Sequence, residues 1–162
     1  MKKLLQLSML AALGVASLSG DVKAGAATAA GALCRPLTSG SYIAGTVSFT
    51  NTGSTGITVS CPIPMDNVAL GSTVTFRVSA NDASTTDGFT CIPYVHNENG
   101  TAIDDAGPRT SAFSLTGLIT LGGTGSGWTA NVPGNVNTNM YAVQCYVPGN
   151  FSSINTVRAE SP

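Results

Sequence analysis

The chain contains very few charged residues, and lysine is almost missing from it. Charged side chains make up 9% of the 162 residues. The only lysines are Lys2, Lys3 and Lys23, all near the N-terminus. From residue 27 onward four arginines face seven acidic residues, which gives a net charge of −3. Nucleic-acid binding depends on clustered cations that displace counterions, and the sequence has no such cluster, so we exclude a nucleic-acid partner.

Patterns that carry chemistry are also missing. His96 is the single histidine, and the cysteines Cys34, Cys61, Cys91 and Cys145 have no C-x-x-C spacing. A zinc site would need more ligands of this kind, and a thioredoxin-like redox site would need the paired spacing. The Gly-x-Ser-x-Gly elbow of serine hydrolases is absent as well. We therefore expect a protein that is not an enzyme.

The N-terminus has the pattern of a secretory signal peptide. Lys2 and Lys3 precede an apolar stretch at residues 4–18, and Ala24-Gly25-Ala26 fits the small-x-small cleavage pattern. The apolar stretch is too short to span a bilayer, which disfavours the alternative of an uncleaved anchor. We expect residues 1–26 to be removed and the mature chain not to insert into a membrane. The expected location is extracellular or at the surface of a bacterial cell, with the periplasm as the other compartment.

Beyond residue 41, short alternations of apolar and polar residues are separated by Gly, Asn and Pro, which suit tight turns. In the clearest run, residues 73–80, the side chains of Val74, Phe76 and Val78 point one way and the polar residues between them the other. No window of ten or more residues has helical spacing. The pattern predicts one all-β domain at residues 41–162. We expect an antiparallel β-sandwich of about eight strands, immunoglobulin-like or jelly-roll-like.

Residues 27–40 precede this domain and begin with the Ala-rich run at 27–33. The side chains of this run are too small to pack much of a core. We therefore expect a flexible lead-in rich in Ala and Gly. The alternative is a strand donated to a neighbouring subunit.

The four cysteines lie on or beside the predicted strands. Outside the cytoplasm an even set of cysteines most simply forms disulfides, so we expect two. Four cysteines allow three pairings, and the sequence alone does not select one. We favour Cys34–Cys61 and Cys91–Cys145, because the second pair would join two strands with apolar inward faces. Pro62 then ends the strand of Cys61, since proline has no N–H for the ladder.

The loop at residues 81–88 is a candidate calcium site. Asp82 and Asp87 flank Ser84 and Thr86, so the loop is rich in the oxygen ligands that calcium prefers. The strict Asp-x-Asp-x-Asp-Gly spacing is missing, which favours a solvated turn. We expect no cofactor, with calcium at Asp82 and Asp87 as the alternative.

Aromatic residues are the remaining candidates for ligand binding. Exposed aromatic rings on a β-sandwich can stack on sugar faces, as in carbohydrate-binding modules, and Trp128, Tyr94 and Tyr146 are the candidates for this role. The alternative for Trp128 is a place in the core, on one face with Ala130 and Val132. For Trp128 we prefer the core.

Three segments, "CPIPMDN", "YAVQCYVPG" and "SSINTVRAE", resemble secreted bacterial proteins of unassigned function. The shared features are a Cys-Pro strand end with an acidic-Asn turn, a Tyr-x-x-x-Cys-x-x-Pro motif, and a closing strand that ends in Arg-x-Glu. In this chain these features are Cys61-Pro62, Asp66-Asn67, Tyr141, Cys145, Pro148, Arg158 and Glu160. The resemblance covers residues 34–160 and implies a disulfide-stapled β-domain but no activity.

The leading functional hypothesis is a secreted, non-enzymatic β-sandwich that acts through its surface as a structural, appendage or matrix component. The low charge and the abundant Thr, Ser and Asn suit contacts with protein partners or self-assembly, and an open edge strand can recruit another chain. A glycan-binding module that uses Trp128 and exposed tyrosines is the alternative.

Overall fold

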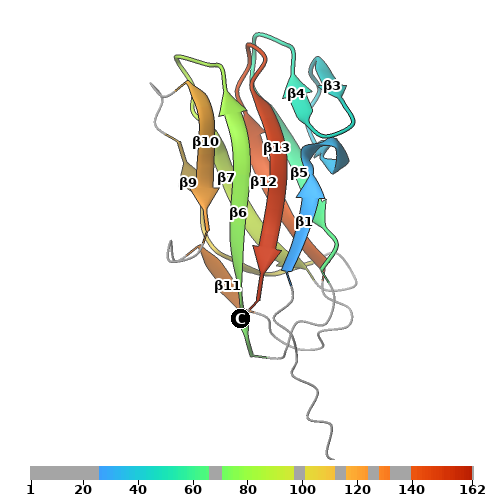
Figure 1. Ribbon diagram of the computed structural model, residues 1–162, viewed down its shortest axis with the longest axis vertical. Coiled ribbons are helices and arrows are strands. Elements are labelled where there is room, and N and C mark those ends of the chain that lie inside the picture. The colour runs from blue at the N-terminus through green and yellow to red at the C-terminus, as the bar shows by residue number, and fades with distance from the viewer. Residues whose placement is uncertain are drawn as a thin grey trace, which may run out of the picture.

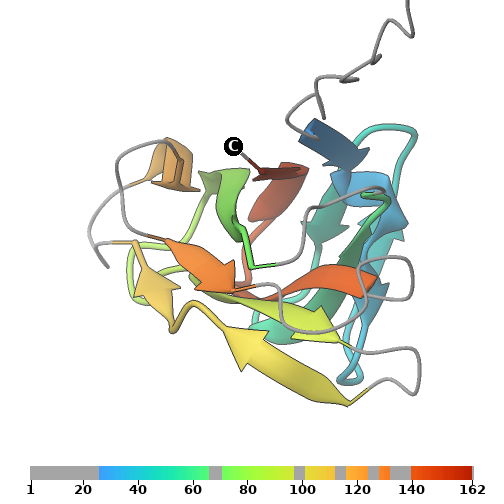
Figure 2. The same ribbon diagram turned by 90° about the horizontal axis from the view of Figure 1, so that it is seen from below.

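The computed structural model describes residues 26–65, 71–96, 101–111, 116–123, 128–131 and 140–161. The expected signal peptide, residues 1–26, lies outside these ranges apart from Ala26. The described chain forms thirteen β-strands and one short 3₁₀ helix, η1 (Gly31–Leu33). The strands build two antiparallel sheets that pack face to face (Figure 1, Figure 2). The predicted antiparallel β-sandwich is confirmed.

The first sheet has seven strands in the order β10-β6-β13-β4-β3, with β1 beside β13 and β11 beside β6. Their bounds are β1 (Ala26–Ala30), β3 (Tyr42–Ala44), β4 (Phe49–Asn51), β6 (Thr73–Asp82), β10 (Gly117–Gly122), β11 (Thr129–Asn131) and β13 (Ser153–Glu160). The second sheet has six strands in the order β2-β5-β12-β7-β8, with β9 beside β7. Their bounds are β2 (Arg35–Pro36), β5 (Ile57–Ile63), β7 (Thr90–His96), β8 (Ala102–Asp105), β9 (Arg109–Thr110) and β12 (Met140–Val147).

The number of strands exceeds the eight expected from the sequence. Five of the thirteen strands, β2, β3, β4, β9 and β11, are only two or three residues long. A strand of this length shows too little alternation to be recognised in a sequence, because one apolar residue and its neighbour fit any pattern.

The core follows the alternation seen in the sequence. Along β6 the side chains of Val74, Phe76 and Val78 are fully buried between the sheets, whereas Thr73 and Arg77 are exposed. The largest fully buried side chains come from both sheets and from the segments that join strands: Trp128, Phe49, Phe76, Phe89, Ile57 and Ile154. The hydrophobic effect thus fixes which face of each strand points inward.

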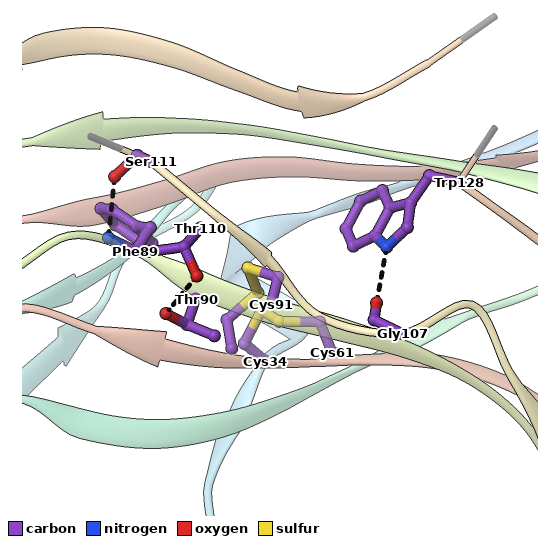
Figure 3. Close-up of a disulfide and its surroundings, with 10 residues drawn as sticks. Cys34, Cys61, Phe89, Thr90, Cys91, Gly107, Thr110, Ser111 and Trp128 are labelled. Atoms are coloured by element: carbon purple, nitrogen blue, oxygen red, sulfur yellow. Dashed lines mark hydrogen bonds between the residues drawn. A yellow bond between two sulfur atoms is a disulfide. The ribbon is translucent and has the colours of Figure 1, made fainter. Parts of the chain in front are cut away.

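Both disulfides lie in the six-stranded sheet and point into the core (Figure 3). Cys91 of β7 lies directly opposite Cys145 of β12, and their Cα atoms are 4.1 Å apart. Cys34 comes just before β2 and bonds to Cys61 of β5, at a Cα–Cα distance of 4.0 Å. This is the pairing that we favoured, and each disulfide staples two neighbouring strands of one sheet.

A flexible lead-in was expected at residues 27–40, but residues 27–36 of it belong to β1, η1 and β2 of the sandwich or directly join them. β1 pairs with β13 over five residues, from Ala26 opposite Glu160 to Ala30 opposite Thr156. Ala29 is 2% exposed, and a Cβ built on Gly31 would overlap the backbone of Ile154. The small side chains that argued against a role in the core are the ones that allow this close approach. β1 thus pairs with β13 of its own chain.

Among the described residues, no helix has the length and apolar character needed to cross a bilayer.

Candidate ligand-binding face

The outer face of the six-stranded sheet brings together two of the three aromatic residues that the sequence marked for ligand binding. Cys91 and Cys145 point into the core, so every second residue along the same strands points outward. On β7 this rule turns Tyr94 outward, and on β12 it turns Tyr146 outward; both side chains are half-buried. The two tyrosines therefore stand on neighbouring strands of one face, turned away from the other sheet.

The pairing register sets the spacing of the two tyrosines. Tyr94 lies opposite Ala142 on β12, four residues before Tyr146. Four residues of a strand span about 13 Å, so the two rings are anchored about 13 Å apart along the sheet. The residue between them on β12 is Gln144, and Ser60 lies opposite Gln144 on β5. Ile92 of β7 also lies opposite Gln144 and faces outward, so both polar and apolar side chains separate the two tyrosines.

The ring of Tyr146 packs against the backbone of Gly56. A Cβ built on Gly56, in the segment between β4 and β5, would overlap the Cζ and Oη atoms of Tyr146. The phenol ring therefore covers the backbone at residue 56, and a side chain there would displace it. Packing of this kind fixes the ring before any ligand arrives.

Tyr94 has an aromatic neighbour of its own. The imidazole ring of His96, two residues further along β7, lies 5.6 Å from the phenol ring, with an angle of 47° between the planes. On the far side of β7, Asp105 of β8 pairs with Tyr94, and its carboxylate accepts a hydrogen bond of 2.8 Å from the N–H of Gly107. The ring of Tyr94 is thus bordered by polar groups that can donate or accept hydrogen bonds.

The middle of this face carries no formal charge. Its outward residues on β5 and β12 are Thr58, Ser60, Pro62, Met140, Ala142, Gln144 and Tyr146. Arg35 stands at the border on β2, opposite Ser60, and its Nη1 donates to the carbonyl oxygens of Ala32 and Cys34. We call this surface, from β5 across β12 to β7, the tyrosine face.

Trp128, the third aromatic candidate, lies in the core and not on a surface. It is 0% exposed, and its Nε1 donates a hydrogen bond of 2.9 Å to the carbonyl oxygen of Gly107 (Figure 3). Its ring meets that of Phe76 edge to face, with centroids 6.5 Å apart. A buried indole offers no face to a sugar, so Trp128 lies in the core, as we preferred, and of the three ligand candidates only Tyr94 and Tyr146 lie on the outer face.

Asp82, a candidate calcium ligand, is buried and serves internal donors. It is 1% exposed, and one carboxylate oxygen accepts a hydrogen bond of 3.0 Å from the N–H of Ser84. The other oxygen accepts one of 3.2 Å from the hydroxyl of Ser111. The Ser152 hydroxyl lies 3.4 Å from the first oxygen. A carboxylate surrounded by donors is occupied structurally, and these contacts tie the β6–β7 loop to residues 111 and 152.

Asp87, the other candidate calcium ligand, lies in the same loop, where its N–H donates 3.0 Å to the Ser84 hydroxyl. Within the described ranges, no three or more His, Cys, Asp and Glu side chains are grouped so that they could hold a metal ion. The structure thus gives the Asp82 carboxylate a structural role.

A shallow apolar groove of about 360 Å³ lies at the end of the tyrosine face. Pro62 and Met140 belong to both the groove and the tyrosine face. The groove residue Leu33 immediately precedes Cys34, which forms the disulfide with Cys61. The full lining is Leu33, Pro62, Ile63, Pro64, Met65, Met140 and Tyr141. The groove extends the tyrosine face with an apolar border.

Gly56, Gln144, Ser60 and His96 were not recognised from the sequence as members of a site. Three of them could have been found from the cysteines: once Cys61, Cys91 and Cys145 are taken as inward, Ser60, His96 and Gln144 must point outward. Gly56 lies outside the strands, and no local pattern connects it to Tyr146.

Comparison with protein-family models gives no match, and neither does comparison with curated proteins. Among solved structures, the chain is similar to a GH26-CBM35 β-(1,4)-mannanase of Podospora anserina, with a TM-score of 0.46 and 11% identity over 85% of this chain and 28% of that one. It is also similar to the C-terminal CBM6 of LamC, a marine laminarinase of Zobellia galactanivorans, with a TM-score of 0.45 and 15% identity over 83% and 98% of the two chains.

A third similar structure is the enzymatically active domain of tailspike protein 4 of bacteriophage CBA120, with a TM-score of 0.45 and 12% identity. It is matched over 85% of this chain and 19% of that one. The chain thus spans 28% and 19% of the length of two of these three structures. At such identities and TM-scores we transfer no function from them, and what the chain binds has to be argued from its own residues.

Proposed function

We propose that this β-sandwich binds an uncharged glycan on its tyrosine face, without catalysing a reaction. The observation that carries the proposal is the placement of Tyr94 and Tyr146 on neighbouring strands of one outer face, about 13 Å apart along the sheet. Two rings at that spacing can contact different sugar units of one oligosaccharide chain, whereas a single ring would hold only one.

The chemistry of the two rings suits a sugar. A pyranose has an apolar face of C–H groups, and an aromatic ring offers it a flat apolar surface with negative charge on its face. At the level midway between the rings, Gln144 supplies an amide group and Ser60, beside it on β5, a hydroxyl group, and both can donate and accept hydrogen bonds. A ligand site typically combines aromatic surface with a few placed polar groups, and the tyrosine face has both.

The charge of the face selects the class of glycan. The outward residues of β5 and β12 are uncharged, and the border of the face carries one arginine, Arg35, and one aspartate, Asp105. Among its described residues the tyrosine face has no cluster of cationic side chains that could bind sulfate or uronate groups, so we expect a neutral polysaccharide. Both disulfides suit an oxidising compartment outside the cytoplasm, where such polymers are met.

The experiment is a glycan array probed with wild type, Tyr94→Ala and Tyr146→Ala. Tyr42→Ala is the matched control, because Tyr42 is 44% exposed but lies on β3 of the other sheet. We expect wild type and Tyr42→Ala to bind the same neutral glycans, and each substitution on the tyrosine face to weaken binding about tenfold, or about 1.4 kcal/mol. An equal loss of glycan affinity in all three variants, or a wild-type protein that binds no glycan, would overturn the proposal.

Salt dependence separates this proposal from binding to acidic glycans. A contact made by tyrosine rings and neutral polar groups should change little between low and physiological salt, because screening acts on charges. Binding that weakens steeply with salt would instead point to Arg35 as an anion contact and contradict the neutral class.

The second candidate is the role in protein contacts that we first expected. The observation that favours it is the concentration of exposed apolar side chains in one segment: Leu33, Leu37, Tyr42, Ile43 and Val47 are 44–67% exposed. Exposed apolar patches mark interaction sites when they are contiguous. If this segment carries the function, Ile43→Asp should release the protein from the surface or matrix of its cell, whereas Tyr146→Ala should leave it attached.

A further inference from the structure

β10 (Gly117–Gly122) forms an edge of the seven-stranded sheet. It comes at the end of the strand order and pairs with β6. In Figure 1 it is the left-hand strand of the front sheet, and no described strand pairs with its other side. Every second residue of β10 therefore directs its backbone N–H and C=O away from the sheet.

One hydrogen bond determines which residues these are. The N–H of Gly123 donates 2.8 Å to the carbonyl oxygen of Phe76, so position 123 faces β6. In an antiparallel ladder the direction alternates, so residues 121, 119 and 117 also face β6. The N–H and C=O groups of Leu118, Thr120 and Gly122 then point toward the open side.

The residues of β10 include none of the features that usually keep edge strands apart. Charged side chains, proline and bulges serve that purpose in natural sheets. β8 carries Asp104 and Asp105, and β2 is Arg35-Pro36, whereas β10 reads "GLITLG". No Asp, Glu, Lys or Arg occurs anywhere between Arg109 and Arg158. Leu118 is 75% exposed, so this strand presents a large apolar side chain to solvent.

We propose that β10 pairs with β10 of a second copy of this chain, antiparallel and about a two-fold axis at Thr120. The three residues with open backbone groups are symmetric about position 120, so two copies offer each other the same donors and acceptors. In this register Thr120 faces Thr120 of the second copy, and Leu118 faces Gly122, which leaves space for the leucine. Neither strand carries a charge that would repel the other. A closed two-fold pair also leaves no further β10 edge for growth.

The register is tested by cysteine cross-linking of the purified, oxidised, mature protein. Residues that face each other in a hydrogen-bonded antiparallel pair have Cα atoms about 5.5 Å apart, within disulfide range. T120C should therefore form a covalent dimer under a mild oxidant. L118C is the matched control: it is exposed on the same strand, but the two copies of residue 118 are about 13 Å apart in this register. We expect several-fold more dimer from T120C. Equal yields, or more dimer from L118C, would overturn the register.

The assembly is tested by sedimentation of wild type, L118K and L118T over a range of concentrations. Wild type and L118T should form dimers as concentration rises, and L118K should remain a monomer, because its charge at the edge opposes pairing. Circular dichroism confirms that each variant is folded. A wild-type protein that stays monomeric, or that grows into filaments, would contradict the two-fold pair; filaments would instead indicate pairing between two different edges.

This inference is independent of the glycan proposal. β10 lies in the seven-stranded sheet, and the tyrosine face is the outer face of the other sheet. Loss of dimerisation in L118K with unchanged glycan binding would show that the two surfaces act separately.

Discussion

The ring of Tyr146 lies over the backbone of Gly56, in the space that a side chain at residue 56 would need. The two residues belong to different parts of the chain and are brought together by the pairing of β12 with β5, which sets Tyr146 opposite Thr58. A ring that is already packed loses little freedom when a ligand binds, so this contact prepares the tyrosine face for binding.

Gly56→Ala should therefore weaken glycan binding by displacing Tyr146, although residue 56 need not touch the ligand. The added methyl group forces the ring aside, and overpacking of this kind costs about 1–3 kcal/mol. We expect a lower thermal midpoint in calorimetry and weaker binding in a glycan titration. Gly45→Ala is the control, because a Cβ there would meet its nearest atom, the carbonyl oxygen of Ser48, at 3.5 Å. Unchanged binding by Gly56→Ala would show that the position of Tyr146 does not matter.

Removing either disulfide should destabilise the domain strongly. The Cys91–Cys145 bridge closes a separation of 54 residues and the Cys34–Cys61 bridge one of 27. Chain-entropy estimates give about 4 and about 3.5 kcal/mol, large fractions of the stability of a small domain. Denaturant unfolding of the two double Cys→Ser variants measures both losses. A melting curve that is the same with and without reductant would contradict the stabilising role.

Asp82→Ala should destabilise the domain because it leaves buried donors without an acceptor. The N–H of Ser84 and the hydroxyl of Ser111 would both lose their partner, at a cost of about 1–3 kcal/mol for each unsatisfied group. Asp105→Ala is the control: its carboxylate is exposed and accepts from Gly107, so water can replace it. We expect the Asp82 variant to unfold at a clearly lower temperature.

The same melting experiment tests the calcium alternative for Asp82 and Asp87. The internal donors that surround the Asp82 carboxylate leave a cation no role, so wild type should melt at one temperature with calcium and with a chelator. A midpoint that rises with calcium concentration would mean that the loop rearranges to bind the ion.

Trp128 should report on folding and not on glycan binding. Its indole ring is buried, with Nε1 bonded to Gly107, so its fluorescence emission should be blue-shifted in the native protein. Emission should move to the red on unfolding and should not change on titration with a glycan. A ligand-induced shift would place the binding site near Trp128.

Much of this fold could be predicted from the sequence, because burial acts on every second residue of a strand. The alternation around Phe76 predicted β6, and the two staples were expected from an even number of cysteines outside the cytoplasm. The Ala-rich strand β1 was not predicted, because its stability comes from pairing with β13. The partners in this pairing are at least 126 residues apart in the sequence, as between Ala30 and Thr156. Local propensity contains no information on a partner at that distance.

The candidate site could be predicted only in part. Tyr94 and Tyr146 were recognised as ligand candidates. Whether they share one face depends on the register between β7 and β12, and this register follows from the Cys91–Cys145 pairing, which the sequence alone does not select. For Trp128 the sequence left a choice between surface and core, because exposure depends on what covers a residue. The resemblance to secreted bacterial β-domains stays a prediction.

The most direct test of the glycan proposal is to map backbone amide chemical shifts of isotope-labelled protein during titration with a neutral oligosaccharide retained on the array. We predict that the shifts cluster on β5, β7 and β12 around Ser60, Tyr94 and Tyr146, and that Tyr146→Ala reduces them. Shifts confined to the seven-stranded sheet, or to the segment from Leu33 to Val47, would contradict a binding site on the tyrosine face.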